Sequence, residues 1–384
     1  MSPKKPLINK LPINSATSSP AVVNDPASSR NATDNILRPK TLADYVGQKA
    51  VTGKLKVFLE AAKKRGGVLD HVLLSGPPGL GKTTLAHILA QEMGGRLHLI
   101  PAPSIERAVD LLAILSNIQA GDVLFIDEIH RLSPIIEESL YPAMEDFQIQ
   151  VVLGEGAAAQ SVTVPLQKFT LVGATTQPGK LSAPLRDRFG IPMTLDFYDV
   201  EEMILILKRS SKILGIEWIE NFVSGIAQRS RGTPRVGNRL LARVRDFLEV
   251  SPQVTGMGSQ GLAKNPESSK QLVVDALEFL EVDSRGLQSL DRRYLKTLLD
   301  YFKGGPAGIE AIAASLAEDR GTLEETIEPY LLKEGFIIRS PRGRVLTDLA
   351  YSHLGLRKPE ILSSAPGLKP NSPLLSPLLT DENL

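Results

Sequence analysis

The segment GPPGLGKT, residues 76–83, constrains the fold of this chain more than any other part of the sequence. It follows an apolar run, HVLLS, and precedes a helical pattern, TTLAHILAQEM. Glycines at these spacings let backbone N–H groups close around phosphates at the start of a helix, whose dipole also favours anions. Lys82 would then reach the β and γ phosphates, and Thr83 would offer its hydroxyl to Mg²⁺. This order predicts an α/β nucleotide-binding domain whose loop comprises Gly79, Gly81, Lys82, Thr83 and Thr84.

Composition and charge narrow the class of protein. A chain of 384 residues is long enough for two or three domains that each bury a core. Its 44 basic and 43 acidic residues give a net charge of +1, so any contact with nucleic acid must come from a local patch. The absence of cysteine excludes disulfides, thiolate zinc sites and cysteine nucleophiles, and it suits a reducing compartment.

Histidine spacing and hydropathy exclude two further classes. The five histidines have no metal-ligand spacing, so we expect them to be packing or surface residues. No apolar run approaches the length of a membrane span, and the first residues lack a signal-peptide core. We therefore expect a soluble, cytoplasmic protein without membrane contact.

Residues 36–198 alternate short apolar runs with amphipathic segments. HVLLS, VLFID and FTLVGA have the character of buried strands, which predicts a parallel sheet covered by helices on both faces. Residues 148–168 alternate around a Gly-rich turn and predict a protruding hairpin, which is either a plain surface feature or a docking site. Residues 1–35 and 357–384 have the composition of disordered tails.

Residues 199–286 are predicted to form a small helical domain. Asp199 and Glu202 are expected to cap its first helix. Further helices are expected at 217–229, with Trp218 as a packing anchor, and at 236–249, before a Gly/Ser/Pro-rich inserted loop at 251–270.

Residues 287–356 show the order of a winged helix. A helix and a GGPAG turn are followed by a short helix at 309–316, then by a second helix opening at Thr322 with Glu325 as its capping partner. The segment GFIIRSPRGRVLT then predicts two short strands around a Pro-Arg-Gly turn.

Two carboxylates follow the strand VLFID, about 45 residues after the phosphate loop. Asp127 would lie near Mg²⁺, and Glu128 would take a proton from an attacking water. The strand FTLVGATT places Thr176 at the edge where ligands of open α/β sheets bind, so Thr176 could sense the γ-phosphate or position the water, or it could simply end the strand.

In RGTPR, Thr233 can cap a helix that begins at Pro234. Arg235 would oppose that helix's dipole, which indicates an anionic partner such as a nucleotide phosphate.

The motifs GPPGLGKT, FIDEIH, GATT, LRDRFG and GTPR, in this order and before a winged helix, resemble those of the AAA+ ATPases. Among these, the chain resembles the RuvB family of bacterial Holliday-junction branch-migration motors, over about residues 36–356. The resemblance implies a large AAA+ P-loop domain, a small helical lid domain and a C-terminal winged-helix domain. It also implies ATP and Mg²⁺ as cofactors, a hexameric ring, double-stranded DNA at four-way junctions as substrate, a role in recombination and repair, and a RuvA-like junction-binding partner.

The same resemblance assigns roles to single residues. The sensor threonine falls on Thr176, the second sensor on Arg235 and the arginine finger on Arg188, while the hairpin at about 148–168 falls where the RuvA-like partner docks. The nucleotide pocket would also include Leu37, Arg38, Asp146, Phe147, Gln148 and Tyr198. The DNA-contacting arginines fall on Arg320, Arg339 and Arg344.

The stretch LRDRFG contains two arginines, Arg186 and Arg188, that by themselves are compatible with a solvated loop screened by Asp187. In a ring, an arginine placed after the sensor strand would point toward the neighbouring subunit's phosphate loop and stabilise charge on the transferring phosphoryl group. We expect this role for Arg188, and an interface or loop-bracing role for Arg186.

The charges of residues 287–356 favour DNA contacts that do not read sequence. This segment has nine basic and ten acidic residues, and its second helix carries Glu324, Glu325 and Glu328, which phosphates around a major groove would repel. The turn RSPRGR concentrates Arg339, Arg342 and Arg344, enough for backbone contacts, although a solvated basic hairpin remains the alternative.

The sequence is less consistent with two other functions. A clamp-loader subunit would have a helical C-terminal collar, which the winged helix disfavours. A DNA-binding regulator that uses ATP as a switch would need a base-reading helix, which the acidic second helix disfavours, and the GAFTGA loop of sigma-54 activators is absent.

Overall fold

The computed structural model describes residues 36–153, 160–216, 223–250 and 266–357. The chain divides into two units, residues 1–38 and 39–384, and only residues 36–38 of the first are described. The expected tails, the hairpin tip, Trp218 and most of the expected loop at 251–270 lie outside the described residues.

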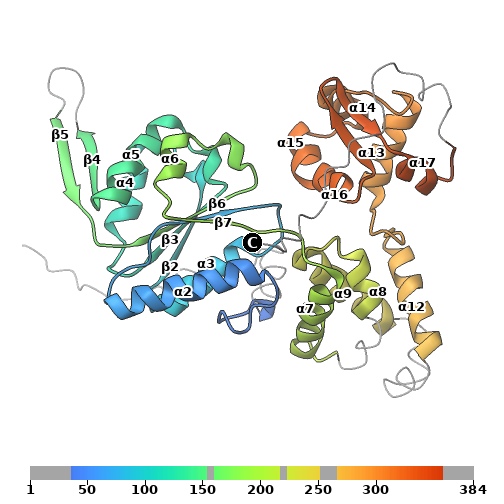
Figure 1. Cartoon of the computed structure of the whole chain (residues 1–384), viewed down its shortest axis with the longest axis horizontal. Coiled ribbons are helices and arrows are strands. Elements are labelled where there is room, and N and C mark those ends of the chain that lie inside the picture. The colour runs from blue at the N-terminus through green and yellow to red at the C-terminus, as the bar shows by residue number, and fades with distance from the viewer. Residues whose placement is uncertain (1–35, 154–159, 217–222, 251–265, 358–384) are drawn as a thin grey trace, which may run out of the picture. The chain divides into compact units, whose positions relative to one another are not determined.

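A five-stranded parallel sheet organises the part of the chain that contains the phosphate loop (Figure 1). The strand order is β2-β3-β6-β1-β7, and every neighbouring pair is parallel. The three expected strands lie at its centre, whereas the edge strands β2 and β7 were not expected, because no residue of β2 is fully buried and β7 alternates buried with exposed residues. The strands are β1 (Val72–Ser75), β2 (Leu97–Pro101), β3 (Val123–Asp127), β6 (Thr170–Thr175) and β7 (Ile191–Thr194).

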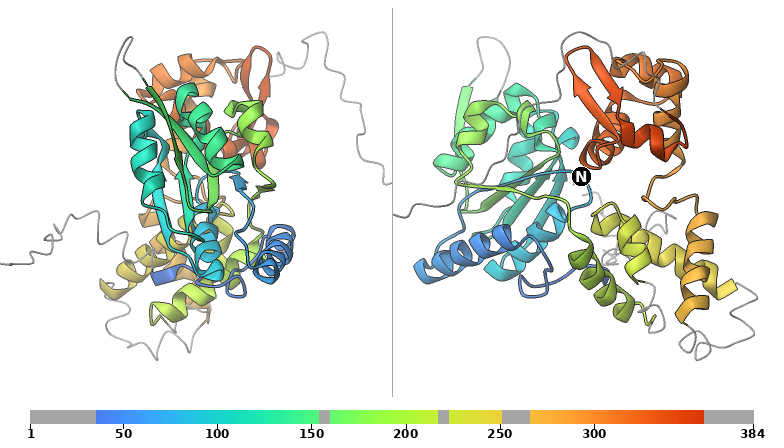
Figure 2. Two further views of the ribbon diagram at one scale, coloured as in Figure 1. Left: turned by 90° about the vertical axis from the view of Figure 1, so that its left-hand side faces the viewer. Right: turned by 45° about the vertical axis from the view of Figure 1, so that its right-hand side comes forward.

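Helices cover both faces of this sheet, as predicted (Figures 1 and 2). Alternate strand residues enter two separate cores: Val72 and Leu74 pack with α2 and α3, whereas Leu73 packs with α4, α5 and α6. Period-two alternation is what a strand buried on both faces produces. The covering elements are α2 (Lys49–Arg65), α3 (Lys82–Met93), α4 (Ala108–Ser116), α5 (Pro134–Glu145) and α6 (Ala183–Asp187), with short 3-10 turns η1 (Ala102–Ser104), η2 (Ile129–Arg131) and η4 (Pro178–Lys180).

The predicted hairpin is formed by β4 (Gln148–Leu153) and β5 (Gln160–Pro165). The two strands are antiparallel, with Ile149 opposite Val164. They form a sheet of their own and do not join the parallel sheet (Figure 1).

The helices of the next group, as far as its residues are described, are α7 (Val200–Ile213), α8 (Val223–Arg229), α9 (Pro234–Val250) and α12 (Pro266–Phe279). The predicted cap of α7 is confirmed, because Asp199 Oδ1 accepts a 2.7 Å hydrogen bond from Glu202 N. In return, the Glu202 carboxylate accepts from Asp199 N, which completes a capping box.

The last group has the predicted winged-helix order: α13 (Ser289–Asp300), α14 (Ile309–Leu316), a second helix, strands β8 (Ile337–Ser340) and β9 (Gly343–Leu346), and α17 (Asp348–His353). The second helix runs from α15 (Arg320–Thr322) through a π-helical segment, η6 (Leu323–Ile327), into α16 (Glu328–Lys333). The prediction that it opens at Thr322 with Glu325 as capping partner is wrong. Asp319 is the N-cap, because its carboxylate accepts from Thr322 N at 3.1 Å and so starts the helix almost a turn earlier.

Over the described ranges, none of the helices combines the length and the apolar character needed to cross a membrane.

Candidate nucleotide site and DNA-contacting wing

The phosphate loop leaves the carboxyl end of β1 and enters α3. Three of its glycines have positive φ angles: 137° at Gly76, 82° at Gly79 and 102° at Gly81. A Cβ atom at Gly76 would lie 2.4 Å from the Leu195 carbonyl oxygen, so the backbone is packed too closely for a side chain there. The loop therefore keeps the backbone-lined cradle that a phosphate group needs.

Lys82 is the first residue of α3, and only 7% of it is exposed. Its ammonium group donates to the carbonyl oxygens of Gly76 at 2.7 Å and Pro77 at 3.1 Å. Since an ammonium group has three donors, one remains for an anion bound in the loop. Burial lowers the pKa of Lys82, and the nearby carboxylates of Glu128 and Asp127 oppose that shift.

The carboxylates of Asp127 and Glu128 lie beside this lysine at the carboxyl end of β3. Burial, and then the charge of Glu128, raise the pKa of Asp127. A carboxylate in this condition is stabilised by a cation. No cluster of three metal-ligating side chains exists among the described residues. Mg²⁺ nevertheless fits, because it keeps several waters and binds phosphate oxygens, so that Asp127 and the Thr83 hydroxyl suffice as protein ligands.

Glu128 is held in place by its neighbours on β6 and η2. Its Oε2 atom accepts from the backbone N–H of Thr176 at 3.1 Å and from the Thr176 hydroxyl at 2.9 Å. The same oxygen lies 3.2 Å from His130 Nδ1, which in turn lies 2.9 Å from the Thr175 hydroxyl. The Thr175 hydroxyl and the Glu128 carboxylate therefore both lie beside the Nδ1 edge of this imidazole. These contacts all engage Oε2, which leaves Oε1 for a water.

His130 is therefore part of the site and is not the ordinary packing or surface residue that was expected. Burial lowers the pKa of His130, which favours the neutral imidazole beside Glu128. The sequence feature that could have placed His130 in the site is its position three residues after Asp127, in FIDEIH.

The hydroxyls of two buried tyrosines, Tyr45 and Tyr198, contact the backbone of the phosphate loop at Leu80. The hydroxyls of Tyr45 and Tyr198 each lie 3.2 Å from the Leu80 carbonyl oxygen, and Tyr198 donates to Tyr45 at 2.8 Å. Burial raises the pKa of Tyr198 to about 12 and also raises that of Tyr45, so both hydroxyls keep their protons even in mildly alkaline solution. Tyr198 was expected near the nucleotide, whereas no motif marked Tyr45.

Arg235 lies at the start of α9, which begins at Pro234 as predicted. Its backbone N–H points at the Gly79 carbonyl oxygen, 3.4 Å away, and its charge acts on Lys82 and Asp127. The Thr233 hydroxyl donates to the Ser230 carbonyl oxygen at 3.1 Å. The second-sensor candidate is thus next to the phosphate loop.

The two arginines of LRDRFG have different surroundings. Arg186 donates to the carbonyl oxygens of Pro178 at 2.7 Å and Leu181 at 3.4 Å, contacts that suit loop bracing, one of the two roles expected for it. Arg188 donates to Pro184 O at 2.8 Å, stacks 4.0 Å from the centre of the Tyr141 ring and pairs with Glu145. These contacts are all within the chain, so a role for Arg188 in a neighbouring site stays a prediction.

The structure does not bring Asp146, Phe147 and Gln148 to the phosphate loop of the same chain. The Phe147 ring packs against His71 and Phe169, at centroid distances of 6.3 and 6.0 Å. His71 precedes β1 and Phe169 precedes β6, so the three residues lie at the amino ends of these strands, roughly 13 Å from the loop. Leu37 and Arg38 belong to the other unit, and their place beside the nucleotide also stays a prediction.

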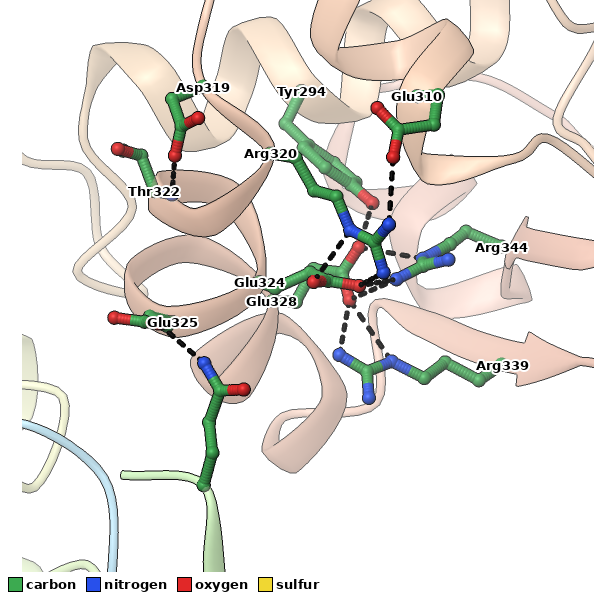
Figure 3. A network of polar contacts seen from close by, with 11 residues as sticks. Tyr294, Glu310, Asp319, Arg320, Thr322, Glu324, Glu325, Glu328, Arg339 and Arg344 are labelled. Carbon is green, nitrogen blue, oxygen red and sulfur yellow. Dashed lines mark hydrogen bonds and ion pairs between the residues drawn. The ribbon is translucent and has the colours of Figure 1, made fainter. Parts of the chain in front are cut away.

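The three predicted DNA-contacting arginines lie together on the winged helix, where they meet three glutamates (Figure 3). Arg320 pairs with Glu310 at 2.8 Å and with Glu324 at 3.0 Å. Arg344 pairs with Glu328 at 2.8 Å and with Glu324 at 3.0 Å, and Arg339 pairs with Glu328. Two glutamates of the acidic second helix are thus neutralised by the wing.

Three family models match consecutive segments of the chain. The family models are the Holliday junction DNA helicase RuvB P-loop domain over residues 37–195, the RuvB AAA lid domain over 198–283 and the RuvB C-terminal winged helix domain over 284–355. They confirm the predicted fold class.

Solved structures agree with this result. The Thermotoga maritima RuvB Holliday junction branch migration motor is 48% identical to this chain, with a TM-score of 0.75, and the match covers 84% of this chain and 100% of that one. Two variants of the Thermotoga maritima protein match with 48% and 47% identity and a TM-score of 0.75, covering 84% of this chain and 99% of theirs.

Proposed function

This chain belongs to the RuvB family of Holliday-junction branch-migration ATPases, and from that premise we propose how it works. It is an ATP-driven motor that assembles as a ring, most simply a hexamer, and pumps duplex DNA so that a four-way junction migrates during recombination and repair. It acts in the cytoplasm with a RuvA-like junction-binding protein. One observation carries the proposal. Thr176 donates two hydrogen bonds to Glu128, which lies beside the buried Lys82.

The chemistry proposed at this site is ATP hydrolysis by an activated water. Lys82 would bind the β and γ phosphates, and Asp127 and Thr83 would hold Mg²⁺, which neutralises phosphate charge when it is bound. Glu128, with Oε1 free, would accept the proton of the attacking water. Arg235, at the start of α9, would contact a nucleotide phosphate and so respond to whether that phosphate is present.

A ring is proposed because one chain does not complete the site. Asp146, Phe147 and Gln148 lie at the amino ends of the strands, so we propose that they face the nucleotide of an adjacent subunit. Arg188 would leave Glu145 and Tyr141 to reach that subunit's γ-phosphate. The hairpin of β4 and β5, separate from the main sheet, is the proposed docking element for the RuvA-like protein.

DNA contact is assigned to the wing of β8 and β9. Its exposed arginines would bind phosphates, which positions a protein on DNA without specifying sequence. A motor that moves along any duplex requires contacts of this kind. The pairing of Glu324 and Glu328 with arginines removes the repulsion that free carboxylates would exert.

The test is the dissociation of a synthetic four-way junction with fluorescent arms by the purified protein, the RuvA-like protein and ATP. We expect ATP-dependent dissociation by the natural protein and none by Lys82→Ala, which keeps the DNA-binding wing. If the natural protein hydrolyses ATP but leaves the junction intact, the motor proposal is wrong. A footprint on one specific DNA sequence would instead support an ATP-switched regulator.

A further inference from the structure

We propose that Glu328 is a positioning residue that aims Arg339 at a DNA phosphate, with Arg344 and Tyr294 holding the Glu328 carboxylate in place. The inference rests on the proposed DNA contact of the wing. It concerns a residue whose negative charge would otherwise be expected only to weaken DNA binding. The juxtaposition is shown in Figure 3.

Glu328 has no solvent exposure, although its carboxylate lies beside the arginines of the wing to which DNA contact is assigned. Burying an ionised carboxylate is costly unless every lone pair finds a donor. Here Oε1 accepts from the Tyr294 hydroxyl at 2.8 Å and from Arg344 Nε at 2.8 Å. Oε2 accepts from Arg344 Nη2 at 3.1 Å and from Arg339 Nε at 3.0 Å. The carboxylate therefore connects α16 to α13 and to both strands of the wing.

The three arginines around this cluster are not equivalent. The Arg344 side chain is 13% exposed, and its Nε and Nη2 atoms are taken by Glu328 and Glu324. Arg320 is 53% exposed, but all three of its guanidinium nitrogens donate to Glu310 or Glu324. Arg344 is thus a largely buried brace, and Arg320 already shares its charge between two carboxylates.

Arg339 differs from both. Its side chain is 50% exposed, and Glu328 engages its Nε and Nη2 atoms. A guanidinium has five N–H donors, so Nη1 and one hydrogen of Nη2 remain for a second anion. Glu328 therefore fixes one edge of the fork and leaves the other edge directed outward. Because a flexible arginine loses rotamer freedom when it binds, this preorganisation strengthens the contact with a phosphate.

A positioning role for Glu328 and a purely electrostatic effect of its charge predict opposite changes in DNA affinity for Glu328→Gln. The substitution removes one negative charge from a DNA-binding surface, and by charge alone it should tighten binding. It also replaces an acceptor oxygen with an NH₂ group that faces arginine N–H donors, so Arg339 loses its anchor. We expect DNA affinity to fall by about three- to tenfold. The slope of log affinity against log salt should become shallower by about 0.9, which is the loss of one phosphate contact.

The chain offers two matched controls. Glu310→Gln makes the same change of charge at a residue that is 72% exposed and that pairs, within the described part of the chain, with Arg320 alone, and we expect it to tighten binding. Arg342 is an exposed arginine of the same turn that does not pair with Glu328 among the described residues. Arg342→Ala should weaken binding independently of Glu328.

The experiment is a double-mutant cycle on the full chain, with anisotropy of a labelled duplex of arbitrary sequence measured at several salt concentrations. In the Arg339→Ala background, Glu328→Gln should change affinity by less than about twofold, whereas in the Arg342→Ala background it should keep its full effect. Tyr294→Phe, which removes one donor to Glu328, should weaken binding in the same direction and serves if Glu328→Gln does not fold.

The outcomes separate this inference from the proposed function. Tighter binding by Glu328→Gln, as for Glu310→Gln, would mean that the carboxylate only neutralises charge, and the inference would be lost. An undiminished effect in the Arg339→Ala background would show a general structural role and would also overturn it. Failure of the natural protein to bind duplex at any salt concentration would instead overturn the proposed DNA contact itself.

Discussion

Thr176 donates two hydrogen bonds to a single oxygen of Glu128, from its backbone N–H at 3.1 Å and from its hydroxyl at 2.9 Å. The Gly76 N–H, at the start of the phosphate loop, donates to the carbonyl oxygen of the adjacent Thr175 at 3.2 Å. The end of β6 therefore contacts both the phosphate loop and the proposed general base. A movement of this strand end would alter both at once.

Glu128→Gln should slow ATP hydrolysis by about 10²–10⁴-fold, because an amide does not accept the proton of the attacking water. Nucleotide affinity should change little, since Glu128 does not belong to the phosphate loop. Single-turnover hydrolysis and binding of a fluorescent nucleotide measure the two quantities separately. Hydrolysis at the natural rate would remove Glu128 from the proposed role.

Thr176→Val keeps the backbone bond to Glu128 and removes the hydroxyl bond. Hydrogen bonds to charged groups contribute about 1.5–3 kcal/mol, so we expect hydrolysis to fall by roughly 10- to 100-fold. Thr176→Ser retains the hydroxyl and is the matched control, with a rate near that of the natural protein. Equal rates for the Val and Ser variants would contradict the positioning of Glu128 by this hydroxyl.

Tyr45→Phe should destabilise the nucleotide-binding part of the chain by about 1 kcal/mol, because it removes a hydrogen bond to Leu80 O and an acceptor for Tyr198. Tyr198→Phe should have a similar effect. The double variant should lose less than the sum, since Tyr198 donates to Tyr45 and Tyr45 donates to the Leu80 carbonyl oxygen, so that the two bonds form one chain. Urea unfolding measures these differences, and strict additivity would show that the two tyrosines act independently.

Arg188→Ala should reduce ATPase activity by about 10³-fold or more if Arg188 acts as a finger in the adjacent subunit's site. Mixing this variant with Lys82→Ala should partly restore activity, because each type of subunit supplies what the other lacks. Arg186→Ala is the control, and it should affect only the loop that it braces. Mixed subunits that stay inactive would exclude a role in trans.

Stability should fall as the pH is lowered below about 7, partly through His71. Burial lowers the pKa of His71, while the hydrogen bond to Met144 O and the charge of Asp70 oppose the shift. Its Nδ1 accepts from Leu171 N at 2.9 Å, so protonation breaks a buried bond. In the unfolded chain the pKa of histidine is about 6.5, so between that value and the lower folded pKa the unfolded state binds more protons.

The consequence is that stability increases with pH through this window and is lost as the pH falls through it, by at most about 1.4 kcal/mol per pH unit for each such histidine. Urea midpoints at pH 7.5, 6.5 and 5.5 measure the slope. His71→Gln should flatten it, leaving the share of His130, whose pKa is lowered in the same direction. An unchanged slope would show that His71 does not titrate there.

Much of the fold and of the nucleotide site could be predicted from the sequence. Lys82, Asp127 and Thr176 each follow or end a strand with a strong apolar pattern, and parallel strands present their carboxyl ends at one edge. The predicted start of the second helix of the winged-helix group was wrong, because both Asp319 and Thr322 can cap a helix. Only the observed bond from Thr322 N to Asp319 distinguishes them.

The sequence by itself determined the three central strands of the parallel sheet, the phosphate loop and the order of the domains, because these depend on local periodicity and on residues that are adjacent in the chain. Only the tertiary structure decided which distant side chains meet. Tyr45 and Tyr198 bond across 153 positions, and the buried Glu328 joins Arg339 on one strand of the wing to Arg344 on the other. Such contacts leave no periodic trace, since a hydrogen bond depends on the position of two groups in space and not on their separation along the chain.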